Sequence, residues 1–128
     1  MYCLLTNAAA YREAQEEVDR VIGAGSISPH HLQELKYLNA VLRESIRLYP
    51  PAPAFVLRSN TAADSCFQLG EHIVEGKPPI LVLLENVHRD PEVYGDDAEY
   101  FRPERMLDAN FDKLPKNAWK VSNSNLAP

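Results

Sequence analysis

The chain has 128 residues and a formal net charge of -5, from 13 basic and 18 acidic side chains. Its length suffices for one small domain with a core, and its 45% apolar and 24% charged content is typical of soluble globular proteins. No basic run favours a nucleic-acid partner, and no apolar run is long enough to span a membrane. Two cysteines, Cys3 and Cys66, are too few for a disulfide framework, which favours a reducing, cytoplasmic location.

The first half of the chain has helical spacing. Residues 1–6 have the apolar character of the end of a helix. Residues 8–23 form an amphipathic pattern, with Asn7 placed to cap its start and Gly23 to end it. The face expected to be buried carries Tyr11, Ala14, Val18, Val21 and Ile22.

A second helical region precedes a cluster of prolines. Ser28 followed by Pro29 is a helix-start signal, so a short helix is expected to run through Leu35. The main helix is then expected over residues 38–49, where the prolines stop it. Its apolar stripe runs through Val41, Leu42, Ser45, Leu48 and Tyr49.

The pattern changes to strands and loops after the prolines. Residues 54–59 and 80–84 are short apolar stretches, and residues 66–74 have the pattern of a strand interrupted at Gly70. These stretches predict two or three strands paired as an antiparallel hairpin. Residues 86–119 have mostly loop composition, and loops of this length are usually functional or packed on something that is absent here.

Glu44 and Arg47 lie three residues apart on the main helix, at the edge of its apolar stripe, so they are neighbours on the helix surface. One interpretation is an exposed ion pair that contributes about 0.3–0.5 kcal/mol. The other is a buried pair completed by a third charged group. Arg102 and Arg105 are candidates for that group, because a guanidinium can hold a carboxylate through two hydrogen bonds. A solvated basic loop is the alternative for these two arginines.

The histidines do not indicate a metal site. His30, His31, His72 and His88 combine with the cysteines in no zinc-binding spacing, so no metal is expected. His88 is instead expected to cap a turn or to bond the backbone. The sequence also contains no phosphate-binding loop, nucleophile elbow or dinucleotide-binding fingerprint.

Three stretches taken in order, residues 35–55, 87–107 and 114–120, resemble the haem-thiolate monooxygenases of the cytochrome P-450 family. The Glu-x-x-Arg motif of that family is matched by Glu44 and Arg47, and its aromatic-x-Pro-Glu-Arg motif by Phe101 to Arg105. The resemblance implies an α+β fragment of the mainly α cytochrome P-450 fold: the end of helix I, helices J and K, a small antiparallel sheet and the meander loop. It implies a partial haem domain over residues 1–120, with 121–128 as an unrelated and disordered tail.

The resemblance also implies roles for individual residues. Glu44, Arg47 and Arg105 would form a salt-bridged triad that holds the loops beneath the haem, and Arg58 would contact a haem propionate. Near the haem and the substrate would lie Ala52, Pro53, Ala54 and Phe55.

Within this family, the sequence is most similar to the fungal self-sufficient type, in which the haem domain is fused to a flavin-containing reductase. That likeness implies hydroxylation of a fatty-acid-like substrate with dioxygen and electrons from NADPH through FAD and FMN. The cysteine loop of the family has no counterpart, because neither Cys3 nor Cys66 has its context. The chain is therefore expected to be a fragment without the haem-ligating cysteine, inactive on its own and without bound haem. The alternative is a non-catalytic remnant, or a fragment that binds a partner through exposed apolar faces.

Overall fold

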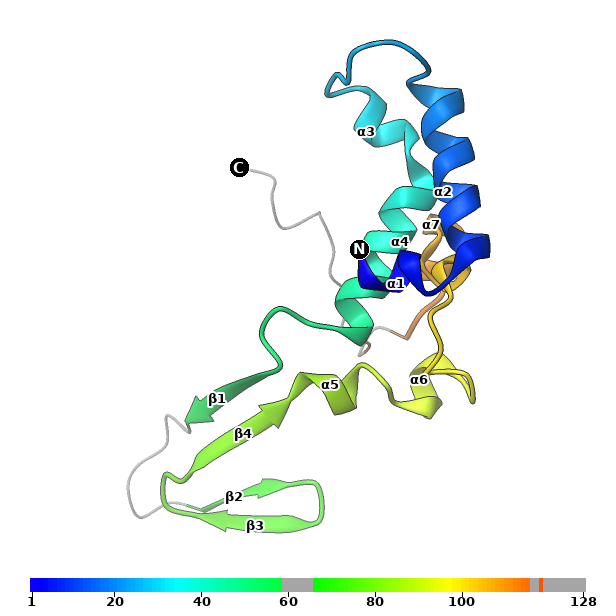
Figure 1. Ribbon diagram of the computed structural model, residues 1–128. Helices are drawn as coiled ribbons and strands as arrows, with labels where there is room; N and C mark the ends of the chain where they lie inside the picture. Colours follow the sequence, from blue (N-terminus) through cyan, green and yellow to red (C-terminus); the bar gives the residue numbers. More distant parts are fainter. Residues whose placement is uncertain (59–65, 116–117, 119–128) are drawn as a thin grey trace.

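The computed structural model describes residues 1–58, 66–115 and 118, so the expected tail at 121–128 lies outside the described residues. Helices gather at one end of the molecule and two pairs of strands at the other, as Figure 1 shows. The helices of the first half are α1 (Tyr2–Leu5), α2 (Ala8–Val21), α3 (His31–Glu34) and α4 (Lys36–Leu48). In the described ranges no helix is both long and apolar enough to cross a membrane.

Helix α2 begins and ends close to its predicted bounds. Gly23 follows it with a φ of 57°, a backbone conformation that glycine adopts without steric cost. The predicted capping role of the Asn7 side chain is wrong, because its amide donates to the Cys3 carbonyl at 2.8 Å instead. The predicted buried face is also wrong in part: Tyr11 is exposed, whereas Ala10, Ala14 and Glu17 are buried.

Helix α4 is buried along a stripe that contains two charged residues. Leu42 and Tyr49, which the apolar pattern placed on the buried stripe, are exposed. The buried residues are Tyr37, Ala40, Val41, Glu44, Arg47 and Leu48. Hydropathy scores Glu44 and Arg47 as polar even though they are buried. The stripe predicted from hydropathy therefore lies to one side of the face that the structure buries.

The strands form two separate antiparallel pairs rather than one hairpin. Strand β1 (Ala54–Arg58) pairs with β4 (Pro79–Leu83), and β2 (Cys66–Leu69) pairs with β3 (His72–Glu75). The turn between β2 and β3 contains Gly70. The β2–β3 hairpin is therefore an insertion between two strands that pair with each other.

The segment after β4 is a chain of short helical turns that returns to α4. These turns are α5 (Leu84–Val87), α6 (Pro91–Tyr94), the 3-10 helix η1 (Pro103–Met106) and α7 (Asp108–Phe111). One buried cluster joins them to α4, and it contains Ala40, Tyr94, Ala98, Met106 and Phe111. The segment was expected to be functional or to pack on something absent, but its η1 turn packs on α4 of this chain.

Candidate functional site

The Glu44 carboxylate lies at the centre of the buried face of α4, with a relative exposure of 0%. Arg47, one turn later and 3% exposed, donates from Nε to one carboxylate oxygen and from Nη2 to the other, both at 2.8 Å. This two-point contact is the strong form of a charged hydrogen bond. A buried carboxylate is costly unless it is paired, so the exposed interpretation of this pair is excluded.

The third charged group comes from η1. Arg105 donates from Nε to Glu44 Oε1 at 3.1 Å, and the backbone N–H of Arg102 donates to the same oxygen at 3.0 Å. The side chain of Arg102 points elsewhere and pairs with Asp97. Of the two candidate arginines, only Arg105 therefore binds Glu44 through its guanidinium. Residues 44, 47 and 105 are brought together from segments about sixty positions apart in the sequence.

Arg47 also binds three backbone carbonyls of the segment that follows the sheet. Its Nη1 donates to the carbonyls of His88 and Ala98, each at 2.7 Å, and its Nη2 donates to the Tyr100 carbonyl at 3.3 Å. The guanidinium carbon lies 4.8 Å from the centre of the Tyr94 ring, within the range of a cation–π contact. The arginine therefore satisfies its donors and fixes the course of this segment around α4.

Arg105, on η1, also binds backbone carbonyls of the segment that follows the sheet. Its Nη1 donates to the Tyr94 carbonyl at 2.7 Å, and its Nη2 donates to the Asp97 carbonyl at 3.0 Å. The same Nη2 forms an ion pair of 3.1 Å with the Asp97 carboxylate. The hydrogen bond from Arg102 and the nearby Arg105 lower the pKa of Asp97 below its usual range. Asp97 thus supplies the second carboxylate of the network, and nothing in the sequence distinguished it from Asp96.

His88 and Arg89 close the end of α4. The last carbonyls of a helix have no partner within the helix. The Nδ1 of His88 is 3.0 Å from the Arg47 carbonyl, and Nη2 of Arg89 donates to the Leu48 carbonyl at 2.7 Å. The prediction that His88 bonds backbone is confirmed. Burial, together with the charges of Arg47 and Arg89, lowers the pKa of His88, although its backbone hydrogen bond acts in the opposite direction.

A further arginine of α4 binds the end of the same segment. Arg43 donates to the Met106 carbonyl at 3.1 Å and to Asp108 at 2.8 Å, and it lies 4.4 Å from the centre of the Phe111 ring. Nothing in the sequence marks this residue, because its partners are a backbone carbonyl and a side chain more than sixty residues away. Within the described ranges, no group of three His, Cys, Asp or Glu side chains could hold a metal ion.

The remaining predicted site residues lie at the start of the sheet. Ala52 and Pro53 are exposed before β1, and Ala54 and Phe55 are half-buried within it. Because successive side chains of a strand point to opposite faces, Ala54 shares its face with Arg58, and Phe55 lies on the other face. Arg58 is exposed at the end of the strand.

Residues 1–121 match the family model described as Cytochrome P-450. The chain belongs to the cytochrome P-450 family. It is 51% identical over 121 residues to a self-sufficient cytochrome P-450 monooxygenase of Oidiodendron maius. This match covers 93% of this chain and 11% of that protein. It is 48% identical over 123 residues to a bifunctional cytochrome P-450/NADPH–P-450 reductase of Aspergillus oryzae, with the same two shares. The chain therefore spans about a tenth of the length of these curated relatives.

Membership of the cytochrome P-450 family raises the question of which residues fit a haem. A haem has a flat apolar body with two carboxylates at one edge. The face of β1 and β4 that carries Arg58 also carries the exposed side chains of Val56, Leu81 and Leu83, so it offers an apolar surface with a cation at one end. Neither thiol lies on this face: Cys3 is buried in α1, and Cys66 is on the separate β2–β3 hairpin.

Replacing the buried carboxylate without changing its shape tests the network. We expect Glu44→Gln to lower the free energy of unfolding by about 3–5 kcal/mol, because Arg47 would remain buried without a counter-charge. The matched control is Asp108→Asn, which removes a partly exposed ion pair and should cost less than about 1 kcal/mol. Urea denaturation of both variants measures the two losses of stability. Equal small losses would show that the buried pair stabilises the fold no more than the partly exposed pair does.

The histidine at the end of α4 gives a pH dependence. Folding lowers the pKa of His88 from its usual 6.5, so above that pH the ring is neutral in both states and its contribution to stability is fully present. As the pH falls below 6.5, the unfolded chain takes up a proton that the folded chain does not, and the free energy of unfolding decreases.

Denaturation between about pH 5 and 8 measures this dependence. His88→Asn, whose amide nitrogen can replace Nδ1, should flatten the curve, whereas His72→Gln on the exposed edge of β3 should leave it unchanged. Parallel curves for His88→Asn and the unsubstituted chain would rule out His88 as the titrating group.

Proposed function

We propose that residues 1–120 are part of the haem domain of a monooxygenase that inserts one atom of dioxygen into a C–H bond of a fatty-acid-like substrate. The observation that carries the proposal is the closed network of Glu44, Arg47 and Arg105, which stand at the matching positions of two family motifs. Bound haem with a cysteine thiolate supplies the oxygen-activating chemistry. In this proposal the residues of the network are structural and do not transfer protons.

The elements take their family roles in this proposal. Helix α1 is the end of helix I, α2 is helix J and α4 is helix K. The meander is the segment whose backbone carbonyls, from Tyr94 to Tyr100, are held by Arg47 and Arg105. A loop that is held through its carbonyls at this many points keeps one conformation, which a site for a large rigid cofactor requires.

The face of β1 that carries Arg58 is proposed to lie against the haem. There Arg58 would pair with a propionate, and its apolar neighbours would contact the flat body of the haem. The substrate pocket is proposed to begin at Ala52, Pro53, Ala54 and Phe55, where small side chains leave room for a ligand. Strand alternation favours Ala54 over Phe55 for contact on the same side as Arg58.

The electron supply is proposed from the relatives. One is named as self-sufficient and another as a bifunctional cytochrome P-450/NADPH–P-450 reductase. NADPH, FAD and FMN are therefore proposed for the longer protein, and none of these for this stretch. A cytoplasmic location agrees with the two free cysteines. The iron ligand is proposed to come from a cysteine other than Cys3 and Cys66, in a part of the protein outside residues 1–120, with 121–128 unrelated to the haem domain.

A segment exchange tests this function directly. Residues 1–120 of this chain would replace the matching segment of the Oidiodendron maius relative, and the Aspergillus oryzae segment would serve as the matched control exchange. We expect the exchanged protein to show the thiolate-type band of its reduced carbon monoxide complex. We also expect fatty acids to increase its NADPH consumption. An exchanged protein that folds without this band, while the control exchange shows it, would refute the proposal.

The isolated chain should behave differently. With added haem we expect no thiolate-type band, because Cys3 is buried and Cys66 is on a different pair of strands from Arg58. An absorption spectrum of the reduced chain with carbon monoxide measures this. A thiolate-type band that disappears in Cys66→Ser would show that this cysteine can reach the iron.

A further inference from the structure

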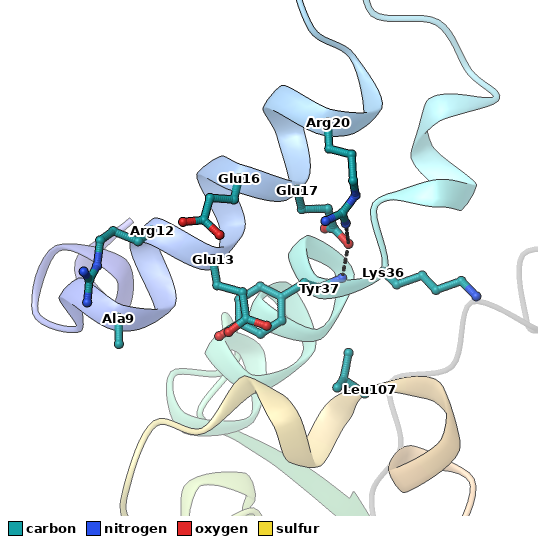
Figure 2. A pocket seen from close by; sticks show the side chains of 9 residues that line it. All are labelled: Ala9, Arg12, Glu13, Glu16, Glu17, Arg20, Lys36, Tyr37 and Leu107. Carbon is teal, nitrogen blue, oxygen red and sulfur yellow. Dashed lines mark hydrogen bonds and ion pairs between the residues drawn. The ribbon is translucent and has the colours of Figure 1, made fainter.

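A second buried carboxylate lies at the opposite end of α4 from His88. Glu17, on α2, has a relative exposure of 5%. One of its oxygens accepts the backbone N–H of Tyr37 at 2.8 Å, and the other accepts the backbone N–H of Leu38 at 2.8 Å. Figure 2 shows Glu17 turned from α2 toward the start of α4, beside a cleft of about 480 Å³.

These two amides are at the start of a helix, where backbone N–H groups have no partner within the helix. Such groups are usually satisfied by a side chain of the N-cap residue. The N-cap of α4 is Leu35, whose side chain cannot accept a hydrogen bond. The carboxylate of Glu17 therefore acts as the cap from another helix, and its negative charge lies at the positive end of the α4 dipole.

The amides, rather than a charged side chain, are the principal partners of Glu17. Arg20 approaches the carboxylate only to 4.0 Å, and the arginine side chain is 71% exposed. Exposed contacts of this kind contribute little. The Tyr37 hydroxyl in turn donates to Glu104 of η1 at 3.2 Å, so the start of α4 is tied to α2 through its backbone and to η1 through a side chain.

The position of this cap determines where the rest of α4 lies. Glu44 is seven residues after Tyr37, about two turns along the same face of the helix. A slip of one residue would move Glu44 by about 1.5 Å along the axis and by about 100° around it. The 3.1 Å hydrogen bond from Arg105 to Glu44 would not survive such a slip, because Arg105 is on a separate segment.

We propose that Glu17 is a positioning residue: its carboxylate fixes the start of α4 and thereby places Glu44 in contact with Arg105. The positioning by Glu17 matters for a haem only if the proposed function is correct, whereas the contact of Glu17 with the start of α4 does not depend on that function. The test therefore uses the 128-residue chain without haem, so failure of haem binding and failure of this inference are distinguishable.

Hydrogen exchange followed by NMR tests the inference on individual groups. We expect Glu17→Gln to speed exchange of the Tyr37 and Leu38 amides by about 5- to 30-fold, the range that corresponds to losing a helix cap. Exchange of the Arg105 Nε–H should also become faster, because the contact with Glu44 is loosened. Glu16→Gln, an exposed neighbour on α2, is the matched control and should leave all three groups unchanged.

Two further variants separate capping from packing. Glu17→Ala removes both acceptor oxygens and should speed exchange at least as much as Glu17→Gln, which keeps one. Glu17→Asp keeps the charge on a shorter side chain and should give intermediate exchange of the Tyr37 and Leu38 amides. Wild-type-like exchange in Glu17→Gln, or unprotected Tyr37 and Leu38 amides in the unsubstituted chain, would overturn the proposal. So would faster amide exchange with an unchanged Arg105 Nε–H. If Glu17→Gln does not fold, Glu17→Asp decides on the same three groups.

Discussion

The fold depends on one carboxylate that has been removed from water. A charge in a low-dielectric interior is stable only when every partner is present. Glu44 meets this condition with Arg47, Arg105 and the backbone amide of Arg102, and these groups bind it from two separate segments. Because removal of one partner leaves another charge unpaired, the network admits one arrangement of α4 and η1 and disfavours the alternatives.

The same principle extends to both ends of α4. Glu17 accepts amides at its start, and His88 and Arg89 meet carbonyls at its end. The described apolar clusters are small, so they leave much of the positioning to polar contacts with backbone groups. A helix held in this way can serve as a fixed reference for the segments around it, which is the role that a cofactor site requires.

The sequence predicts the elements better than their contacts. Helical spacing located α2 and α4 within a few residues, because apolar periodicity reports local structure directly. The spacing of Glu44 and Arg47 left their burial open, and only the motif resemblance selected Arg105 over Arg102 as their partner. Glu17 was not predicted, since its partners are backbone amides that any residue carries. Asp97 was not predicted, because nothing in the sequence distinguished it from Asp96. Leu42 shows the converse. The apolar pattern predicted it to be buried, but it is exposed, because Glu44 and Arg47 occupy the buried face of the helix.

A double-mutant cycle on Glu44 and Arg105 tests the central claim most directly, because it isolates the contact between the helix and the segment that it holds. The free energies of unfolding would be measured for Glu44→Gln, Arg105→Gln, the double variant and the unsubstituted chain. A coupling energy of about 1–3 kcal/mol is expected for two charges in one buried network. Additive effects within about 0.5 kcal/mol would contradict the account, since they would mean that the two residues stabilise the fold independently.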